Sequence, residues 1–312
     1  MQASNSLERE KYRRDAKEIL QKQLQYVQDA YPFSGLGDVF LDELRDKLRE
    51  PPADGQEPTE DRLKVRVVTD LIGQAEEVIS RGLQNFPGDE YLLTLQASLS
   101  NILQNEPRAM QALETAFKTN PRSDVVATRL AYHYLRSDKR QEAEDTLKKC
   151  LEQNPGSKRV HLELARIFLD SDAKTYKDTI SYHLKRSFTE GDTNYHAQIL
   201  YGRHEFLYGD KREAERIFRN LSNQTFAPQF RNRRWGEVRN AAGTLVEYGG
   251  QVNKRDDSFC FVSIAALGTS VFVHFSQFSG AEWDSLMLNT SIRCNIDFTV
   301  RGPCGVNAKI VR

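Results

Sequence analysis

The stretch FKTNP, residues 117–121, decides the fold of the middle of this chain because its proline recurs at a fixed interval. LQNFP ends at Pro87 and LEQNP ends at Pro155, so successive prolines lie 34 residues apart in both steps. Each proline closes a segment with helical spacing of its apolar residues, and a proline cannot continue a helix. Self-similarity at this period indicates a repeat architecture built from one supersecondary unit.

Small residues recur at fixed offsets from these prolines. In each repeat two small residues stand seven positions apart, with a larger apolar residue between them: Ala75, Ile79 and Gly82, then Ala109, Leu113 and Ala116, then Ala143, Leu147 and Cys150. Small side chains let two helices approach closely, and the larger residue fills the space between them. The pattern therefore predicts closely packed helices.

With these features the segment from about residue 62 to about residue 226 resembles the tetratricopeptide repeat. The family places a leucine, a small residue and an aromatic on the first helix of each pair, as LAYHY (130–134) and LARIF (164–168) do here. A fourth unit carries extra residues around 172–177 before the pattern returns at Gly202. The resemblance implies an α-solenoid whose concave face holds a protein segment.

The family's groove positions fall on a set of residues rich in arginine. They are Thr128, Tyr132, Arg136, Arg159, Arg166 and Arg203. Guanidinium groups suit an acidic peptide, a C-terminal carboxylate or a phosphate backbone. The alternative is a solvated helix face whose arginines pair with nearby glutamates.

Residues 1–61 differ from the repeats. Apolar residues at helical spacing predict one helix over residues 7–31 and a second, shorter one over 39–48. EPPADGQEPTED, residues 50–61, then predicts an exposed acidic linker. The two helices are expected to cap the first repeat or to form the junction to something upstream, in which case the chain is the tail of a larger protein.

A basic segment follows the repeats at residues 227–240. Arg231, Arg233 and Arg234 precede Trp235, which we take to be exposed. Basic residues beside an exposed aromatic suit phosphate binding with a stacking ring attached. The alternative is an inter-domain linker whose arginines pair with the acidic surface of the repeats.

From residue 243 onward, short runs of β-branched and aromatic residues alternate with turn formers. The predicted strands are GTLVEY (243–248), FCFVSI (259–264), VFVHFS (271–276), SIRCNIDFTV (291–300) and NAKIVR (307–312), with turns at 249–258 and 301–305 among those between them. Five short strands in about 70 residues predict a small closed barrel.

This last domain, predicted over residues 241–312, resembles a cold-shock domain, a five-stranded OB-type barrel that binds single-stranded RNA or DNA. DSFCFV (257–262) stands at the family's first ribonucleoprotein motif, and VFVHFS (271–276) coincides with the second. RGPCGVNA (301–308) matches the family's Gly-Pro turn. The resemblance implies a nucleic-acid-binding face.

Strand geometry explains the concentration of rings. Residues two apart share a face, so Phe259 and Phe261 lie together, as do Phe272 and His274 on the neighbouring strand. Four rings would overfill so small a core, whereas on the outside they form a surface for stacking bases; a protein-docking patch is the alternative. The predicted nucleic-acid-binding residues are Tyr248, Lys254, Phe259, Phe261, Phe272, His274 and Phe275, with Arg231, Arg233, Arg234 and Trp235.

The domain also departs from the cold-shock pattern. Asp257, next to Asp256, replaces the lysine of the first motif, and Glu247 replaces the tryptophan of the first strand. Carboxylates near a phosphate path repel it, which predicts weak binding unless the arginines of residues 231–239 compensate.

Other function classes find little support in the sequence. The net charge is zero, the N-terminus has no signal-peptide pattern, and the four cysteines form no CxxC pair. GPCGVNAK lacks P-loop spacing, and no catalytic or metal-binding motif stands out. We expect a cytoplasmic, non-catalytic adaptor without cofactor or metal that binds single-stranded nucleic acid and a protein partner. The alternative is an interaction module or regulatory tail of a larger bacterial stress or defence protein, with nucleic-acid binding lost.

Overall fold

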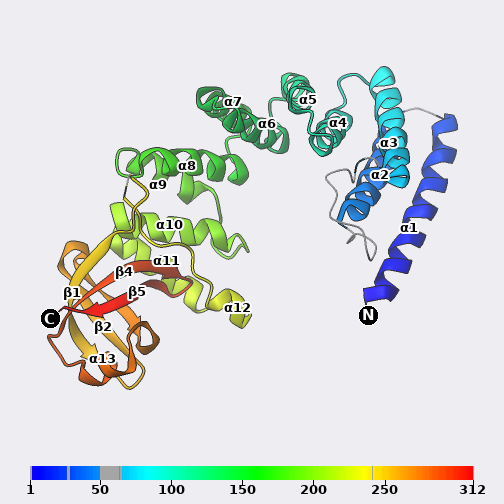
Figure 1. The fold of residues 1–312 in the computed structure, drawn as a ribbon. Coiled ribbons are helices and arrows are strands. Elements are labelled where there is room, and N and C mark those ends of the chain that lie inside the picture. Colours follow the sequence, from blue (N-terminus) through cyan, green and yellow to red (C-terminus); the bar gives the residue numbers. More distant parts are fainter. Residues whose placement is uncertain (1, 27–28, 50–62, 64, 241, 312) are drawn as a thin grey trace. The chain divides into compact units, whose positions relative to one another are not determined.

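The computed structural model describes residues 2–26, 29–49, 63, 65–240 and 242–311. Helices follow one another as far as residue 231, and strands fill the C-terminal part (Figure 1). This order confirms the predicted fold class, an α-solenoid of tetratricopeptide-like helix pairs followed by a five-stranded barrel. The predicted acidic linker at residues 50–61 lies outside the described residues.

Contacts within the chain define two compact units, Met1–Val160 and His161–Arg312. In the first unit each of the first six helices packs on the next along the chain. The helices are α1 (Gln2–Gln23), α2 (Tyr31–Arg49), α3 (Arg66–Asn85), α4 (Glu90–Ile102), α5 (Glu106–Thr119), α6 (Asp124–Arg136) and α7 (Arg140–Gln153), followed by the start of α8 (Lys158–Asp172).

Polar residues and prolines explain where these helices begin and end. Asp89, Asn105 and Ser123 each accept a hydrogen bond from the backbone N–H three residues later, which caps α4, α5 and α6. Such caps contribute about 1 kcal/mol each. One residue separates Pro87 from the end of α3 and Pro121 from the end of α5, so the 34-residue period marks the ends of the second helices of the pairs.

The small residues of the repeat pattern lie where helices approach closely. Ala75 and Ala109 are fully buried. A Cβ atom at Gly82 would lie 2.9 Å from Cδ1 of Leu92, so α3 leaves no room for a larger residue against α4. Phe33 of α2 packs against the same glycine, where the Cβ–Cβ distance would also be 2.9 Å. The small side chains are therefore required by the packing.

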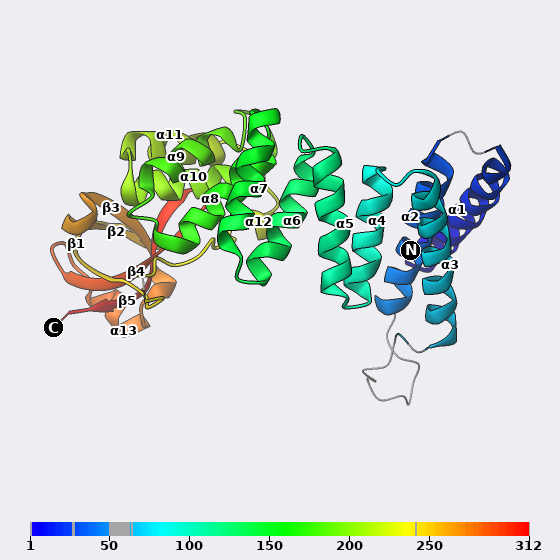
Figure 2. The ribbon, with the colours of Figure 1, turned by 90° about the horizontal axis from the view of Figure 1, so that it is seen from above.

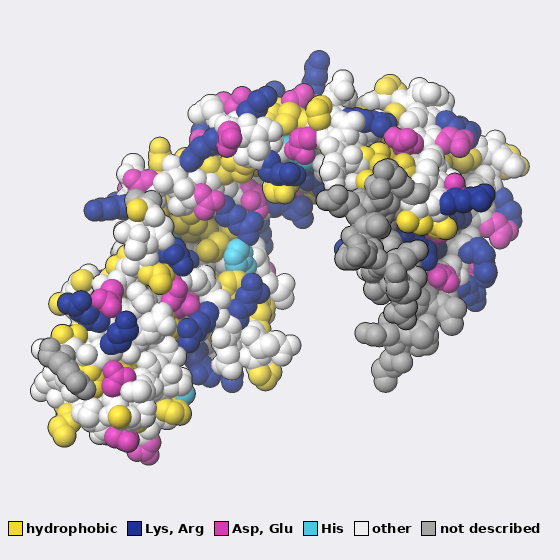
Figure 3. Space-filling view, in the orientation of Figure 1, with side chains coloured by type: hydrophobic (Ala, Val, Ile, Leu, Met, Phe, Trp, Pro, Cys, Tyr) yellow, Lys and Arg dark blue, Asp and Glu magenta, His cyan; other side chains and the backbone are white. Residues whose placement is uncertain are grey.

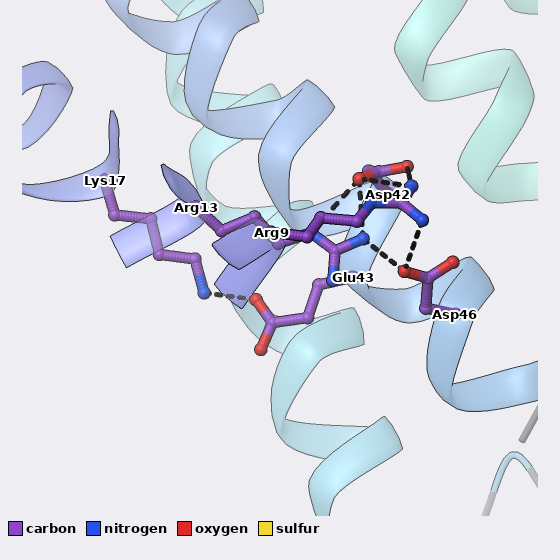
Figure 4. A network of polar contacts seen from close by, with 6 residues as sticks. All are labelled: Arg9, Arg13, Lys17, Asp42, Glu43 and Asp46. Atoms are coloured by element: carbon purple, nitrogen blue, oxygen red, sulfur yellow. Dashed lines mark hydrogen bonds and ion pairs between the residues drawn. The ribbon is translucent and has the colours of Figure 1, made fainter. Parts of the chain in front are cut away.

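A network of ion pairs joins α1 to α2 (Figure 4). Its residues are Arg9, Arg13 and Lys17 on α1, at four-residue spacing, and Asp42, Glu43 and Asp46 on α2. Arg13 donates to Asp42 at 2.6 Å. Burial alone would raise the pKa of Asp42, but the hydrogen bonds and charge of Arg13 outweigh it and hold that pKa below its ordinary value. Leu20 adds a buried apolar contact.

The second unit combines the last helices with the barrel. Its elements after α8 are α9 (Lys177–Arg186), α10 (Tyr195–Tyr208), α11 (Lys211–Ser222), α12 (Pro228–Arg231), β1 (Glu247–Arg255), β2 (Phe259–Ile264), β3 (Thr269–His274), α13 (Gly280–Ser285), β4 (Ser291–Thr299) and β5 (Gly302–Ile310). Within the described ranges, no helix has both the length and the apolar character that a membrane span needs.

The strands close into a barrel in the order β1-β2-β3-β5-β4. All neighbouring strands are antiparallel except β3 and β5, which run parallel. This order is consistent with an OB-type barrel. The inward side chains of the strands are almost completely buried and include Val252, Val262, Val271, Val273, Ile292 and Ile296.

Two strand boundaries differ from the sequence prediction. The pattern predicts a strand at 243–248 and a turn at 249–258, but β1 spans Glu247–Arg255. A Cβ atom at Gly250 would lie 2.6 Å from the carbonyl oxygen of Ser263, so the glycine lets β1 approach β2 instead of ending the strand. Likewise β5 already begins at Gly302, inside the predicted turn.

The barrel packs on the last helix pair, α10 and α11 (Figures 1 and 2). Phe298 of β4 is fully buried. The centroid of its ring lies 5.7 Å from that of Phe206 on α10 and 6.1 Å from that of Phe218 on α11. The helix pair and the barrel therefore share one apolar core.

Part of the predicted basic linker, residues 227–240, packs against the barrel. The backbone N–H groups of Trp235 and Val238 both donate to carbonyl groups of β4 at 2.9 Å. The N–H of Gly236 donates to the buried carboxylate of Asp297, also at 2.9 Å. Residues 235–238 thus lie alongside β4 like a short extra strand.

Candidate functional site

An aromatic surface covers the outside of β2 and β3. Phe259 stands opposite His274 in the strand register, and Phe261 stands opposite Phe272. The ring centroids of Phe259 and Phe272 are 5.4 Å apart, and those of Phe261 and Phe272 are 6.1 Å apart. We call these four residues the platform. Because they come from two hydrogen-bonded strands, the barrel itself fixes the spacing of the rings.

The platform faces away from the barrel core. Its four side chains are half-buried, whereas Cys260 and Val262, which alternate with them on β2, are fully buried. Val273, between Phe272 and His274 on β3, is fully buried as well. The two-residue period of a strand thus separates a packed inner row from an accessible outer row. The binding role of the platform stays a prediction.

Two further predicted residues adjoin the platform. Phe275 is 45% exposed, and its ring centroid lies 4.6 Å from that of His274. Lys254 of β1 stands opposite Phe261 in the register and is exposed. The platform therefore has an aromatic extension at one end and a cation on the neighbouring strand.

Tyr248 and Trp235 do not join the platform. Tyr248 is half-buried on β1 opposite Cys294, and burial raises the pKa of its hydroxyl. Trp235, predicted to be exposed, is half-buried with its ring centroid 5.3 Å from that of His196. Its Nε1 is buried and has no hydrogen-bond partner among the described residues. The physical reason is the pairing of residues 235–238 with β4, which turns the indole onto α10.

The three predicted linker arginines occupy two places. Arg231 and Arg234 are exposed and line a cleft of about 940 Å³ beside the platform. Arg233 instead places its guanidinium over the ring of Trp235, 4.5 Å from the centroid, and is not part of the cleft lining. The structure therefore brings two of the three close to the platform.

The cleft contains two arginines that the sequence did not single out for binding. Arg219 comes from α11 in the repeats, and Arg301 comes from the turn between β4 and β5. They lie far apart in the sequence and share no motif, so no spacing signal connects them. Only the packing of α11 on the barrel brings them into one cleft.

The predicted groove residues of the first unit lie mostly on α6. Thr128, Tyr132 and Arg136 follow one another at four-residue spacing and so share one helix face. Tyr132 is 57% exposed, and the guanidinium of Arg136 lies 5.8 Å from its ring centroid. Arg159 of α8 is also exposed. Their role in binding a partner stays a prediction.

Arg129 lies beside the predicted groove residues, although the family pattern does not select it. Burial is the largest of the effects that lower its pKa, and the positive charges of Arg45 and Arg159 come next. Arg45 and Arg159 therefore both lie close enough to Arg129 to affect its pKa. Arg129 follows Thr128 directly, so a pattern based on single groove positions passes over it.

Arg166 and Arg203, in the second unit, are both engaged within the chain. Arg166 pairs with Glu163 at 2.7 Å and contacts Nδ1 of His196 at 3.1 Å, in line with the alternative that these arginines pair with nearby glutamates. Arg203 donates to two backbone carbonyl groups of residues 235–237 at 3.5 and 3.2 Å. Arg203 therefore holds the chain's own segment, and a peptide ligand would have to displace it.

No arrangement for metal binding is found among the described residues, where no three His, Cys, Asp or Glu side chains converge on a shared position. Cys304 on the cleft wall is half-buried, and burial raises its pKa to about 11, so the thiol stays protonated near neutral pH. A protonated thiol is a poor nucleophile. Cys304 is therefore not an activated nucleophile.

Stacked helix pairs and a closed barrel define a helical-repeat protein that carries an all-β domain with a half-exposed aromatic face. A family model described as tetratricopeptide repeat matches residues 105–167 and does not extend into the barrel. The match covers α5 to α7 and most of α8, where the 34-residue period is most regular. Helical repeats of this kind hold protein segments.

Solved structures with similar helices share little sequence with the chain. The structure titled as the functional characterisation of Pseudomonas aeruginosa pilF has 16% identity and a TM-score of 0.45, and the match covers 69% of this chain and 92% of that one. A thermophilic tetratricopeptide-repeat protein of Thermus thermophilus has 13% identity and a TM-score of 0.36, over 62% and 98%. No curated protein matches the sequence.

Proposed function

We propose that the chain is a non-catalytic adaptor that binds single-stranded RNA or DNA on the platform and a protein partner on the repeats. The observation that carries the nucleic-acid half is the set of four half-exposed rings on β2 and β3, outside a barrel whose core is already filled. Its support from sequence is the resemblance of residues 243–312 to a cold-shock domain.

Stacking supplies the affinity in this proposal. Each base stacked on an aromatic ring contributes about 1 to 3 kcal/mol, and every base has a π-face, so such binding tolerates many sequences. A duplex hides its bases, whereas a single strand exposes them. The proposal therefore requires preference for single strands over duplex.

Charge near the platform is mixed. Asp256 and Asp257 are exposed at the start of β2, and Glu247 on β1 pairs with Arg293 at 3.3 Å. The two exposed aspartates disfavour a phosphate path across this end of the platform. The exposure of these two aspartates also favours a second candidate function, in which the aromatic surface contacts a protein.

The test replaces Phe272, the ring in contact with three other members of the platform. Phe272→Ala and Phe261→Ala are titrated into labelled 12-mers of RNA, single-stranded DNA and duplex at low salt, with anisotropy as the readout. We expect the parent to bind single strands, and each variant to bind about 5- to 150-fold more weakly, as loss of one stacked base implies.

Tyr182→Ala is the matched control because Tyr182 is 50% exposed in the same unit but lies on α9, outside the barrel. Circular dichroism establishes that each variant is folded. A folded Phe272→Ala that binds like Tyr182→Ala contradicts the stacking surface. A parent chain that binds no oligonucleotide at low salt supports protein contact instead.

A further inference from the structure

The cleft beside the platform is built from three parts of the chain. Its walls come from α11, from the segment around residues 231–234, and from β3 with the turn into β5. Phe261, Phe272 and His274 line the cleft and are at the same time members of the platform. A volume of about 940 Å³ lies near the upper end of the range of ligand pockets, about 300 to 1,000 Å³. The platform and the cleft are therefore one continuous surface.

The cleft lining is strongly basic. It contains Arg219, Arg231, Arg234 and Arg301 against a single acidic residue, Glu215, a net charge of +3. In Figure 3, Lys and Arg side chains gather around α12 and over the adjoining edge of the barrel. The protein as a whole has zero net charge, so this concentration is local.

The four cleft arginines differ in their contacts from Arg216 and Arg293 of the same unit. Their guanidinium groups are exposed and make no ion pair or hydrogen bond to any side chain in the described part of the chain. By contrast Arg216, on the same helix as Arg219, pairs with Glu213 at 2.8 Å, and Arg293 pairs with Glu247. The cleft arginines are thus left to interact with something outside the chain.

Apolar packing fixes the two walls relative to each other. Phe218 of α11 stacks on Phe298 of β4 with an angle of 22° between the rings. Gly302, next to Arg301, has a φ of +108° and lies against Phe218, where a Cβ atom would be 3.4 Å from the ring. Phe218 and Gly302, the neighbours in sequence of Arg219 and Arg301, are therefore in contact, and this contact holds both arginines at the same cleft.

We infer that a single strand stacked on the platform continues into this cleft, where Arg219 and Arg301 bind its phosphates. The last repeat helix then forms part of the nucleic-acid site. This inference rests on the proposed function and deepens it, because guanidinium groups bind phosphate with two parallel hydrogen bonds and supply the positive charge that the platform lacks. An acidic peptide matches the charge as well, but the aromatic floor shared with the platform favours stacked bases over carboxylates.

The test uses the full chain with the variants Arg219→Gln, Arg301→Gln and the double variant. Labelled single-stranded 4-mers and 12-mers are titrated at several salt concentrations, because a 4-mer occupies little beyond the platform whereas a 12-mer also reaches the cleft. For the double variant we expect about tenfold weaker binding of the 12-mer at low salt. Loss of two phosphate contacts also flattens the slope of log K against log salt by about 1.4. Affinity for the 4-mer stays within about twofold of the value for Arg212→Gln.

Arg212→Gln is the matched control, since Arg212 is exposed on the same helix as Arg219 and outside the cleft lining. Equal losses from Arg212→Gln and Arg219→Gln overturn the inference, because they show only a general field effect. If Phe272→Ala abolishes binding while the double variant matches the control, the platform stands and the cleft role falls. If the parent binds no oligonucleotide, or binds an acidic 12-residue peptide more tightly than the 12-mer, both fall.

Discussion

His204 on α10 is a buried histidine that affects the response of the second unit to acid. Its side chain is 2% exposed, and Nε2 lies 2.8 Å from the carbonyl oxygen of Lys177, so Nε2 carries the proton in the neutral ring. Nδ1 is buried without a partner among the described residues. Protonation would place a charge in this site, and burial accordingly lowers the pKa of His204 below its ordinary value of 6.5.

Acid should therefore destabilise the second unit. The unfolded chain binds a proton at this histidine more readily than the folded chain. The contribution of His204 to stability is therefore fully present above the ordinary pKa and is lost as the pH falls below it. His196, whose pKa is also lowered by burial and by Arg166 and Arg233, acts in the same direction. We expect a lower thermal unfolding midpoint at about pH 5.5 than at about pH 7.5, and a smaller difference in His204→Gln. An equal difference in the variant contradicts this role.

At the residue scale, the sequence predicted best where a local period decides the outcome. The two-residue period of β2 and β3 is enough to group Phe259 with Phe261 and Phe272 with His274. It could not predict that Trp235 would pack on His196, or that Arg203 would bind the carbonyl groups of residues 235–237, because these contacts depend on packing between distant segments.

Ion pairs contribute to the attachment of helix α1 to α2. Arg13 is only 12% exposed and donates to both Asp42 and Asp46, whereas Arg14, next to it, is 76% exposed. Arg13→Gln should weaken the attachment of α1 by about 1 kcal/mol, with little effect from Arg14→Gln. Hydrogen exchange of residues 8–23 measures the attachment, and high salt should increase exchange there in the parent as well. Equal exchange in the two variants would assign the attachment to apolar contacts such as Leu20.

At the element scale, the sequence predicted which elements exist more accurately than where they begin. The 34-residue period places the ends of α3, α5 and α7 because proline and helix capping are local effects. The strand β1 was misplaced because its Gly249 and Gly250 look like a turn in isolation. Glycine serves there to let the backbone of β1 approach Ser263 on β2, a requirement that exists only in the closed barrel.

At the scale of the whole molecule, the two proposed binding functions fall in different compact units. The exposed groove residues Tyr132, Arg136 and Arg159 belong to the first unit, and the platform belongs to the second. Each function should therefore be removable without the other. The two resemblances in the sequence predict this separation of functions, which stays a prediction. The sequence could not predict that the last helix pair belongs with the barrel.

The double charge reversal Arg136→Glu and Arg159→Glu tests the separation. Because two cations of the groove face become anions, we expect the proteins captured by the parent to be depleted about tenfold, as a loss of about 1.4 kcal/mol implies. Oligonucleotide binding should stay unchanged. Lys118→Glu is the control, since Lys118 is exposed on α5 and outside the predicted groove. Retention of the same partners by the double variant, in quantitative mass spectrometry, contradicts the groove.

The shared core of Phe298 with Phe206 and Phe218 determines how this protein can be cut and recombined. A fragment that starts at residue 243, where the cold-shock resemblance starts, would lose the strand-like segment 235–238 and leave Phe298 uncovered, which favours aggregation. A fragment that starts at residue 161 keeps the helix pair, the segment and the barrel together. The barrel is therefore not an independent domain that can be exchanged freely. If it were fused to another helical array, that array would need aromatic residues to cover Phe298 and an arginine equivalent to Arg203.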